Sequence, residues 1–166
     1  MSRLESAGIV IAAVEGCCAG PDFERALEAD IRLAADAATF SAEGVADVAG
    51  CARRLARLLG EARAKEIVLG GRTFDAATAL RLGLVTRVVP AAALAATARA
   101  LADRLAGLPP LGVAAVRDAV RAARGLTPDA ALALEHAHFR RLVATRDHRR
   151  AVEAFFERRT PVFTGE

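Results

Sequence analysis

IVIAAVEGCCAGPDFERALEADIRLA, residues 9–34, carries the strongest structural pattern in the 166-residue sequence. Residues 9–14 form a β-branched apolar run between glycines, which predicts a fully buried strand. Pro21, followed by acidic residues, is typical of a first helical turn and predicts a helix to about residue 29. A second short strand is expected at residues 30–33. This strand, helix, strand order indicates an α/β fold.

Glycine, proline and capping residues divide the rest of the chain. The elements expected there are a loop with a short strand at 39–41, helices at 51–59, 61–69 and 76–82 (the last capped by Asp75), a strand at 84–89, helices at 91–106, 111–124, 128–145 and 147–158, and an extended tail at 161–166. Residues 1–7 are polar and predict no element. We therefore expect a single domain with a core over residues 1–90 and a helical region over residues 91–166.

Composition and charge exclude several classes of protein. A hydrophobic content of 54% is too high for a disordered chain. The net charge of +3 comes from 22 arginines and one lysine, Lys65, against 20 acidic residues. Arg53, Arg54 and Arg57 alternate with apolar residues at helical spacing, which favours a solvated helix face over a nucleic-acid surface. No nucleic-acid partner is expected.

The cysteines and the apolar runs give no sign of a metal site, a disulfide framework or a membrane anchor. Cys17, Cys18 and Cys51 have no metal-ligand spacing, and their odd number argues against paired disulfides. We expect reduced thiols, with Cys17 and Cys18 as packing residues. The longest apolar run, residues 8–14, is too short to span a bilayer, and no signal-peptide pattern is present. These features predict a soluble, cytoplasmic protein without a membrane partner.

A series of short motifs runs along the sequence in a fixed order. It begins with IAAVEG at residues 11–16, Gly20, Glu24 and DIRLA at residues 30–34. The later motifs are Phe40, Arg54-Leu55, Gly60, residues 64–66, Gly71-Arg72, Ala76, residues 83–85, residues 88–90 and AFFERRTPVF at residues 154–163. In this order and spacing, which cover nearly the whole chain, the sequence resembles the crotonase family of enoyl-CoA hydratases and isomerases.

The resemblance implies a fold and a chemistry. The family's fold is a crotonase-like spiral of ββα units, here incomplete at the N-terminus, followed by C-terminal helices. Its members form trimers or hexamers, and they stabilise the enolate of an acyl-CoA thioester with two backbone N–H groups. Coenzyme A is carried by the substrate, so no separate cofactor is expected. Hydratases of the family use two glutamates, and Glu24 matches the first by position.

Three departures from the family's pattern concern this chemistry. Pro21 stands where the family has a glycine whose N–H forms half of the oxyanion hole, and proline has no N–H. Loss of one such donor costs about 2.7–4 kcal/mol in the transition state. In the family, the other N–H comes from an N-terminal portion that lies before the strand matching residues 9–14 of this chain. Residues 40–54 are four fewer than usual, so Glu43 is the nearest candidate for the second glutamate, with Asp47 less favoured.

The candidate residues also have simpler explanations. Gly20, Pro21 and Asp22 are the candidate oxyanion and substrate-binding residues, but an ionised Asp22 would oppose a nearby enolate. The helix dipole explains Glu24 in a first turn equally well. Glu43 is also typical of an ordinary loop acid. The three histidines, His136, His138 and His148, are expected on the surface.

Three functions therefore remain open. The chain is a lyase or isomerase acting on acyl-CoA with an impaired oxyanion hole, a crotonase-fold protein that binds without catalysis, or a fragment completed by upstream sequence or a complementing crotonase-like subunit. The strand at residues 9–14 is expected to leave an open edge prone to association. Apolar residues of the C-terminal helices, expected to support a homo-oligomer, are Leu132, Leu134, Phe139, Leu142, Phe155 and Phe156.

Overall fold

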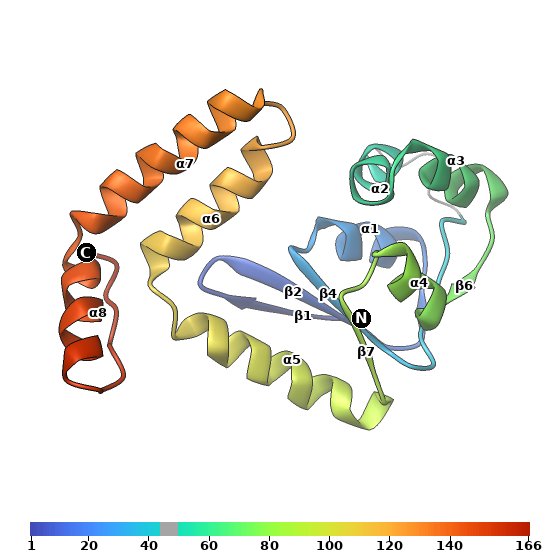
Figure 1. Cartoon of the computed structure of the whole chain (residues 1–166). Coiled ribbons are helices and arrows are strands. Elements are labelled where there is room, and N and C mark those ends of the chain that lie inside the picture. The colour runs from blue at the N-terminus through green and yellow to red at the C-terminus, as the bar shows by residue number, and fades with distance from the viewer. Residues whose placement is uncertain (44–49) are drawn as a thin grey trace. The chain divides into compact units, whose positions relative to one another are not determined.

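The computed structural model describes residues 1–43 and 50–166. It contains two compact units, Met1–Ala102 and Asp103–Glu166, which are coloured in sequence order in Figure 1. The first unit combines strands and helices, and the second consists of helices and an extended tail. The predicted α/β class is confirmed. The predicted arrangement of one domain, with its core over residues 1–90 and its helices over 91–166, stays a prediction.

The main sheet of the first unit has the strand order β1-β2-β4-β7. Its strands are β1 (Ser2–Ser6), β2 (Ile9–Val14), β4 (Ile31–Ala35) and β7 (Arg87–Val89). β2 and β4 pair in parallel, as do β4 and β7. The apolar run of β2 is fully buried at Ile11 and Val14, so the prediction of an interior strand there is confirmed.

The first residues of the chain correct the prediction for this sheet. They form β1, which pairs antiparallel with β2 from Ser2 opposite Ala13 to Ser6 opposite Ile9. Ala7 and Gly8 both have positive φ, the geometry of a tight two-residue hairpin turn. The expected open edge along β2 is therefore wrong, because β1 covers it. Pattern reasoning missed β1 because a polar strand at the rim of a sheet has no apolar periodicity.

A second, small sheet supports the first helix. It has the order β3-β5-β6, with β3 (Cys17–Cys18) parallel to β5 (Thr39–Phe40) and β5 antiparallel to β6 (Phe74–Asp75). Phe40 is fully buried between two other rings: Phe23, at a centroid distance of 6.4 Å, and Phe74, at 5.8 Å. Edge-to-face and stacked aromatic pairs are favourable beyond their buried area. These three rings fasten α1 (Gly20–Glu28) to the small sheet.

The remaining helices of the first unit are α2 (Cys51–Leu59), α3 (Glu61–Gly70), α4 (Ala76–Leu82) and α5 (Ala91–Ala106), and α5 runs past the boundary between the units. Their predicted bounds are confirmed to within one residue. Glycines with positive φ separate these helices, as at Gly60 between α2 and α3. The predicted cap of α4 is present, since the Asp75 carboxylate accepts the Thr78 N–H at 2.8 Å.

A buried guanidinium joins α1 to the main sheet. Arg32 on β4 is 5% exposed and donates from Nε to the Leu84 carbonyl at 2.6 Å. Its Nη1 group donates to the carbonyl oxygen of Ala29 at 2.5 Å and to that of Ala26, both at the C-terminal end of α1. Burial lowers the pKa of Arg32. A cation at a helix C-terminus satisfies carbonyls that have no partner within the helix.

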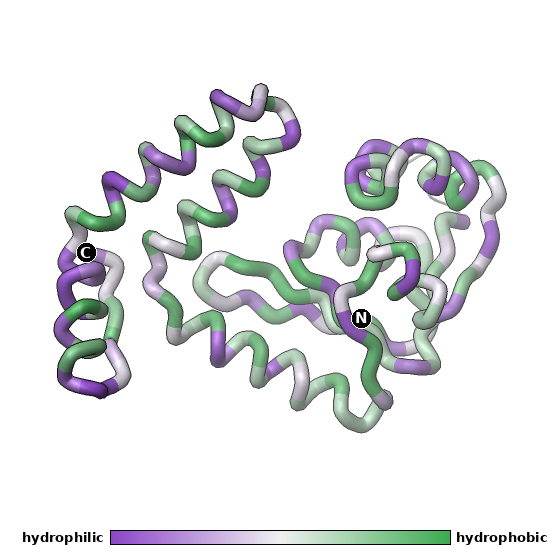
Figure 2. Tube along the Cα trace, viewed as in Figure 1, coloured by the Kyte–Doolittle hydropathy of each residue, from purple (hydrophilic) through white to green (hydrophobic). Residues whose placement is uncertain are grey.

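The second unit contains α6 (Pro110–Ala122), α7 (Pro128–Val143) and α8 (Arg146–Phe156). Thr127 caps α7 and Thr145 caps α8 through their side-chain oxygens, and Figure 1 shows α6 and α7 side by side. Figure 2 shows apolar residues alternating with polar ones along these helices, in contrast to the continuous apolar run of β2. The large apolar side chains that are more than half exposed in this unit are Val116, Val120, Leu132, Phe139, Phe155, Phe156 and Val162.

The C-terminal tail is held to the start of α8 by one buried carboxylate. Asp147 is 2% exposed and accepts the backbone N–H groups of Thr164, at 2.9 Å, and Gly165, at 2.7 Å. The Asp147 N–H donates in turn to the carbonyl of Glu166 at 2.9 Å. These hydrogen bonds, with one from Arg150, hold the pKa of Asp147 below its usual range.

We predict that Phe40→Ala lowers the free energy of unfolding by about 3–5 kcal/mol, because it leaves a cavity between two rings. Chemical denaturation followed by circular dichroism measures the change. Phe155→Ala is the matched control, since Phe155 is 79% exposed and its loss should change stability by less than about 0.5 kcal/mol. Equal effects of the two substitutions would show that Phe40 is not the centre of this core.

We also predict that acid releases the tail. Because the folded pKa of Asp147 lies below its unfolded value of about 3.9, its stabilisation is complete above that pH and is lost as the pH falls through the folded pKa. Hydrogen exchange at the Thr164 and Gly165 amides measures attachment of the tail. Asp147→Asn should speed exchange at neutral pH and remove the acid dependence. Unchanged exchange in that variant would contradict this account.

Candidate functional site

The candidate site lies where the chain passes from β2 through β3 into α1. Gly16 and Gly20 both have positive φ, at 70° and 51°, so the chain turns sharply before β3 and again at the first residue of the helix. Ala19 is the N-cap residue and offers no side-chain cap. Its carbonyl accepts the N–H groups of Asp22, at 3.2 Å, and Phe23, at 3.4 Å. The Phe23 bond is the first regular hydrogen bond of the helix, and the Asp22 bond satisfies one N–H group that a helix start otherwise leaves free.

The three predicted oxyanion residues lie together in this first turn. Pro21 offers no N–H, as the sequence requires. In the part of the chain that the structure describes, the Gly20 N–H has no acceptor. The Asp22 carboxylate lies 3.3 Å from Arg25, and both side chains are largely exposed. An ion pair on the surface neutralises part of the negative charge that the sequence places beside the helix start.

Glu24 follows the first turn of α1 and lies near Cys51 at the start of α2. The residue is half-buried, and its Oε1 atom is shielded from solvent without a hydrogen-bond partner among the described residues. Burial, and then the negative charge of Glu24, raise the pKa of the Cys51 thiol to about 11. Cys51 begins α2 and is 1% exposed, so Glu24 faces a neutral thiol. An unsatisfied buried carboxylate oxygen is costly, and such groups are enriched at functional sites.

The structure places Glu43 just beyond the small sheet. The Ser41 N–H donates to the Cys18 carbonyl, which continues the parallel pairing past Phe40. The Glu43 N–H donates to the Ser41 hydroxyl at 3.1 Å, and its side chain is exposed. Because β3 and β5 are parallel, Glu43 and the start of α1 leave the sheet at the same edge. The described residues show no hydrogen bond between Glu24 and Glu43, and Asp47 lies outside them.

The cysteines differ more than the sequence predicts. Cys18 is buried, and burial with the nearby charge of Asp22 raises its pKa to about 12. Cys17 on the same strand is exposed, so its predicted role in packing is wrong. Successive side chains of a strand point to opposite faces, and a two-residue strand gives no pattern that shows which face is covered. In residues 1–43 and 50–166, no group of three potential ligands could hold a metal ion.

The three histidines belong to the second unit. His136 and His148 are exposed, as predicted. The His138 side chain is only 14% exposed, and its Nε2 atom lies 2.9 Å from an Asp118 carboxylate oxygen across the α6–α7 pair. The surface prediction is therefore wrong for His138, because a neighbouring helix covers it. No helix of the described chain is long and apolar enough to cross a membrane.

The fold is α/β, and its candidate site joins a strand, a glycine-containing turn and a helix that carries a partly buried glutamate. The sequence model of the enoyl-CoA hydratase/isomerase family matches residues 2–166. The chain belongs to the enoyl-CoA hydratase/isomerase family, the crotonases, and the resemblance drawn from the sequence motifs is confirmed.

Individual relatives support the same assignment. The chain is 39% identical over 158 residues to a probable enoyl-CoA hydratase, echA8, of Mycobacterium tuberculosis, with 93% of this chain and 62% of the relative covered. It is 35% identical to the 2,3-dehydroadipyl-CoA hydratase of Escherichia coli, with 94% of this chain and 63% of that protein covered.

The fold has the same relatives. The crystal structure of an enoyl-CoA hydratase from Bacillus anthracis superposes with a TM-score of 0.89 at 33% identity and covers 96% of this chain and 64% of its own. The predicted crotonase-like fold is therefore confirmed. The chain spans about three fifths of the length of the curated relatives it matches.

The three thiols give a test of this geometry. We predict that one thiol of the native chain, Cys17, reacts rapidly with an aromatic disulfide reagent at pH 8, because the other two are buried with raised pKa values. Spectrophotometric titration should show one fast thiol in the native protein and three after denaturation. Cys17→Ser should remove the fast phase, whereas persistence of that phase would show that α1 or α2 does not cover the other thiols.

Proposed function

We propose that the chain acts on enoyl-CoA thioesters as a hydratase or isomerase with a weakened oxyanion hole. The observation that carries this proposal is the buried Oε1 atom of Glu24, which has no partner among the described residues. A carboxylate kept from water and from local hydrogen bonds is free to exchange a proton with a substrate. Glu24 also occupies the position of the family's first glutamate. The named relatives include several enoyl-CoA hydratases, which supports a thioester substrate.

In this proposal the residues at the α1 turn divide the work. Glu24 moves a proton to or from the acyl carbons, and Glu43, at the same edge of the small sheet, serves as the second acid–base group. The Gly20 N–H is the main-chain donor that the turn offers to the thioester oxygen. Pro21 removes the neighbouring donor, and the hole therefore binds the enolate less strongly. Coenzyme A arrives with the substrate, and no further cofactor takes part.

A second candidate function rests on Pro21 itself. A crotonase fold whose oxyanion hole lacks one donor can still bind an acyl-CoA or assemble with other subunits without catalysis. The chain spans 57–63% of the length of its curated relatives, which also supports a fragment of a longer enzyme or a chain completed by a crotonase-like subunit.

Assembly and location belong to the same proposal. Phe139 is 65% exposed, Phe155 79% and Phe156 78%, and apolar side chains exposed to this degree favour contact with other chains. We infer a homo-oligomer, a trimer or a hexamer as in the family, in the cytoplasm. Neither nucleic acid nor a membrane is a partner in this proposal.

The experiment is a hydration assay with crotonyl-CoA, followed by loss of the enoyl-thioester absorbance. We predict weak activity for the native sequence and a rise in kcat/KM for Pro21→Gly of up to about 10²–10³, because the substitution restores a main-chain donor. Adding Glu24→Gln to that variant should lower kcat/KM by a factor of about 10²–10⁴, because this is the usual contribution of a general acid or base.

Glu135→Gln in the Pro21→Gly background is the control, since Glu135 is an exposed carboxylate on α7. It should leave the rate unchanged. If Pro21→Gly does not raise kcat/KM and crotonyl-CoA still binds in equilibrium dialysis, the catalytic proposal is wrong and the non-catalytic candidate is supported. If the chain neither binds nor hydrates crotonyl-CoA, both functions are wrong for the chain on its own.

A further inference from the structure

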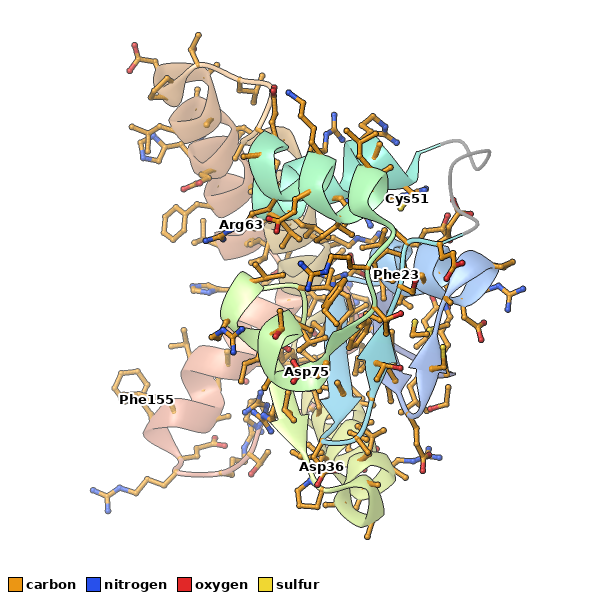
Figure 3. All side chains as sticks on the ribbon, turned by 90° about the vertical axis from the view of Figure 1, so that its right-hand side faces the viewer. Phe23, Asp36, Cys51, Arg63, Asp75 and Phe155 are labelled. Atoms are coloured by element: carbon orange, nitrogen blue, oxygen red, sulfur yellow. The ribbon has the colours of Figure 1, made fainter. Side chains whose placement is uncertain are left out.

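A hollow of about 610 Å³ opens in the first unit between α3, β6 and α4. None of the residues that line it belongs to the turn that carries Gly20, Pro21 and Glu24. Figure 3 shows Arg63, on α3, and Asp75, at the start of α4, on the side of the unit that faces the viewer. A volume of this size lies within the range of sites that bind small organic molecules, roughly 300–1,000 Å³.

Two guanidinium groups, unpaired among the described residues, line the hollow. Arg63 projects from α3, and Arg72 lies in the segment between Gly71 and β6. Both side chains are exposed, and across residues 1–43 and 50–166 neither has a hydrogen bond or an ion pair. Guanidinium groups bind carboxylate and phosphate oxygens with paired N–H donors, which makes two such groups at one hollow a suitable anion site.

The two acidic residues of the lining balance the charge of the arginines formally but form no ion pair with either of them. Asp75 directs its carboxylate to the Thr78 N–H as the cap of α4, and this bond holds the pKa of Asp75 below its usual range. Glu66 follows Arg63 by three positions on α3 but lies beyond ion-pair distance of it. The lining therefore has no net formal charge, and its two guanidinium groups, which have no partner in the described chain, are the hydrogen-bond donors that an anion can use.

Apolar residues form the remainder of the wall. Ile67 is 7% exposed, Leu82 is half-buried, and the Phe74 ring stacks on the buried Phe40. Because Phe74 is fixed by the aromatic core, this part of the wall is rigid before any ligand arrives. A rigid apolar surface beside convergent polar groups is the usual composition of a small-molecule site.

We propose that the hollow between α3, β6 and α4 binds a small organic anion, whose carboxylate or phosphate contacts Arg63 and Arg72 and whose apolar body lies against Phe74 and Leu82. The ligand must have both a charged and an apolar part. An inorganic anion would leave the apolar wall exposed to water, and a neutral hydrocarbon would leave both guanidinium groups without partners. This site goes beyond the proposed hydratase function and does not depend on it.

Calorimetric titration of the full chain tests the proposal with three probes. Phenyl phosphate, which has both an anionic and an apolar part, should bind with a dissociation constant of about 1 mM, as suits a ligand of few atoms. Inorganic phosphate lacks the apolar part, and benzyl alcohol lacks the charge. Each should bind at least about tenfold more weakly than phenyl phosphate. Equal binding of phenyl phosphate and inorganic phosphate, or no binding of phenyl phosphate, overturns the proposal.

Substitutions locate the binding. The double variant Arg63→Gln with Arg72→Gln should weaken phenyl phosphate binding by at least about tenfold, because both charged donors are lost. Arg53→Gln, which removes one exposed arginine from α2, is the charge control and should have no effect. Leu82→Gln should weaken phenyl phosphate but not inorganic phosphate. Equal losses in the control and the double variant would show that only net charge matters, and the proposal would be wrong.

These outcomes are separate from those of the hydratase assay. The variants named for the hollow alter no residue of the α1 turn, and phenyl phosphate contains no thioester. If the chain hydrates crotonyl-CoA but does not bind phenyl phosphate, only the proposed anion site is wrong. If it binds phenyl phosphate but does not hydrate crotonyl-CoA, only the proposed hydratase activity is wrong.

Discussion

The packing of Phe40 between Phe23 and Phe74 is the contact on which the candidate site depends. The three rings belong to β5, α1 and β6, segments that are far apart in the sequence. Two-residue strands supply too few hydrogen bonds to hold a sheet by themselves, so buried aromatic area must do so. By fixing α1 on β5, the rings set where the helix begins. They therefore also set where Glu24 lies relative to the neighbouring α2.

Local signals in the sequence predicted much of this fold. The β-branched run of β2, the glycines around α2 and α3 and the Asp75 cap of α4 each act within a few residues, and each prediction is confirmed. The polar strand β1 and the two-residue strands β3 and β6 escaped prediction because their pairing depends on distant partners. The β1–β2 hairpin closes through a positive φ at both Ala7 and Gly8, and alanine is not a residue that signals such a turn.

The candidate site shows the same division. The sequence alone identified Pro21 as a missing donor, because the absence of an N–H is a property of the residue. Family membership followed from ordered motifs and is shown by the match over residues 2–166. By contrast, the burial of the Glu24 oxygen beside Cys51 and the pairing of Asp22 with Arg25 depend on packing and rotamers. A shared fold does not by itself fix the chemistry of a site.

The hydrogen bonds between Asp147 and the C-terminal tail affect which amino-acid substitutions the tail can accept. The Asp147 carboxylate accepts hydrogen bonds from the main-chain N–H groups of Thr164 and Gly165 and not from their side chains. Main-chain recognition does not distinguish among residues that have an amide hydrogen. Any residue except proline can therefore supply the amide of position 164, whereas Gly165 has a φ of 79°, a conformation that favours glycine. The Thr164 and Glu166 side chains also contact Arg150 and Arg146 of α8, so attachment of the tail rests on several residues of both segments.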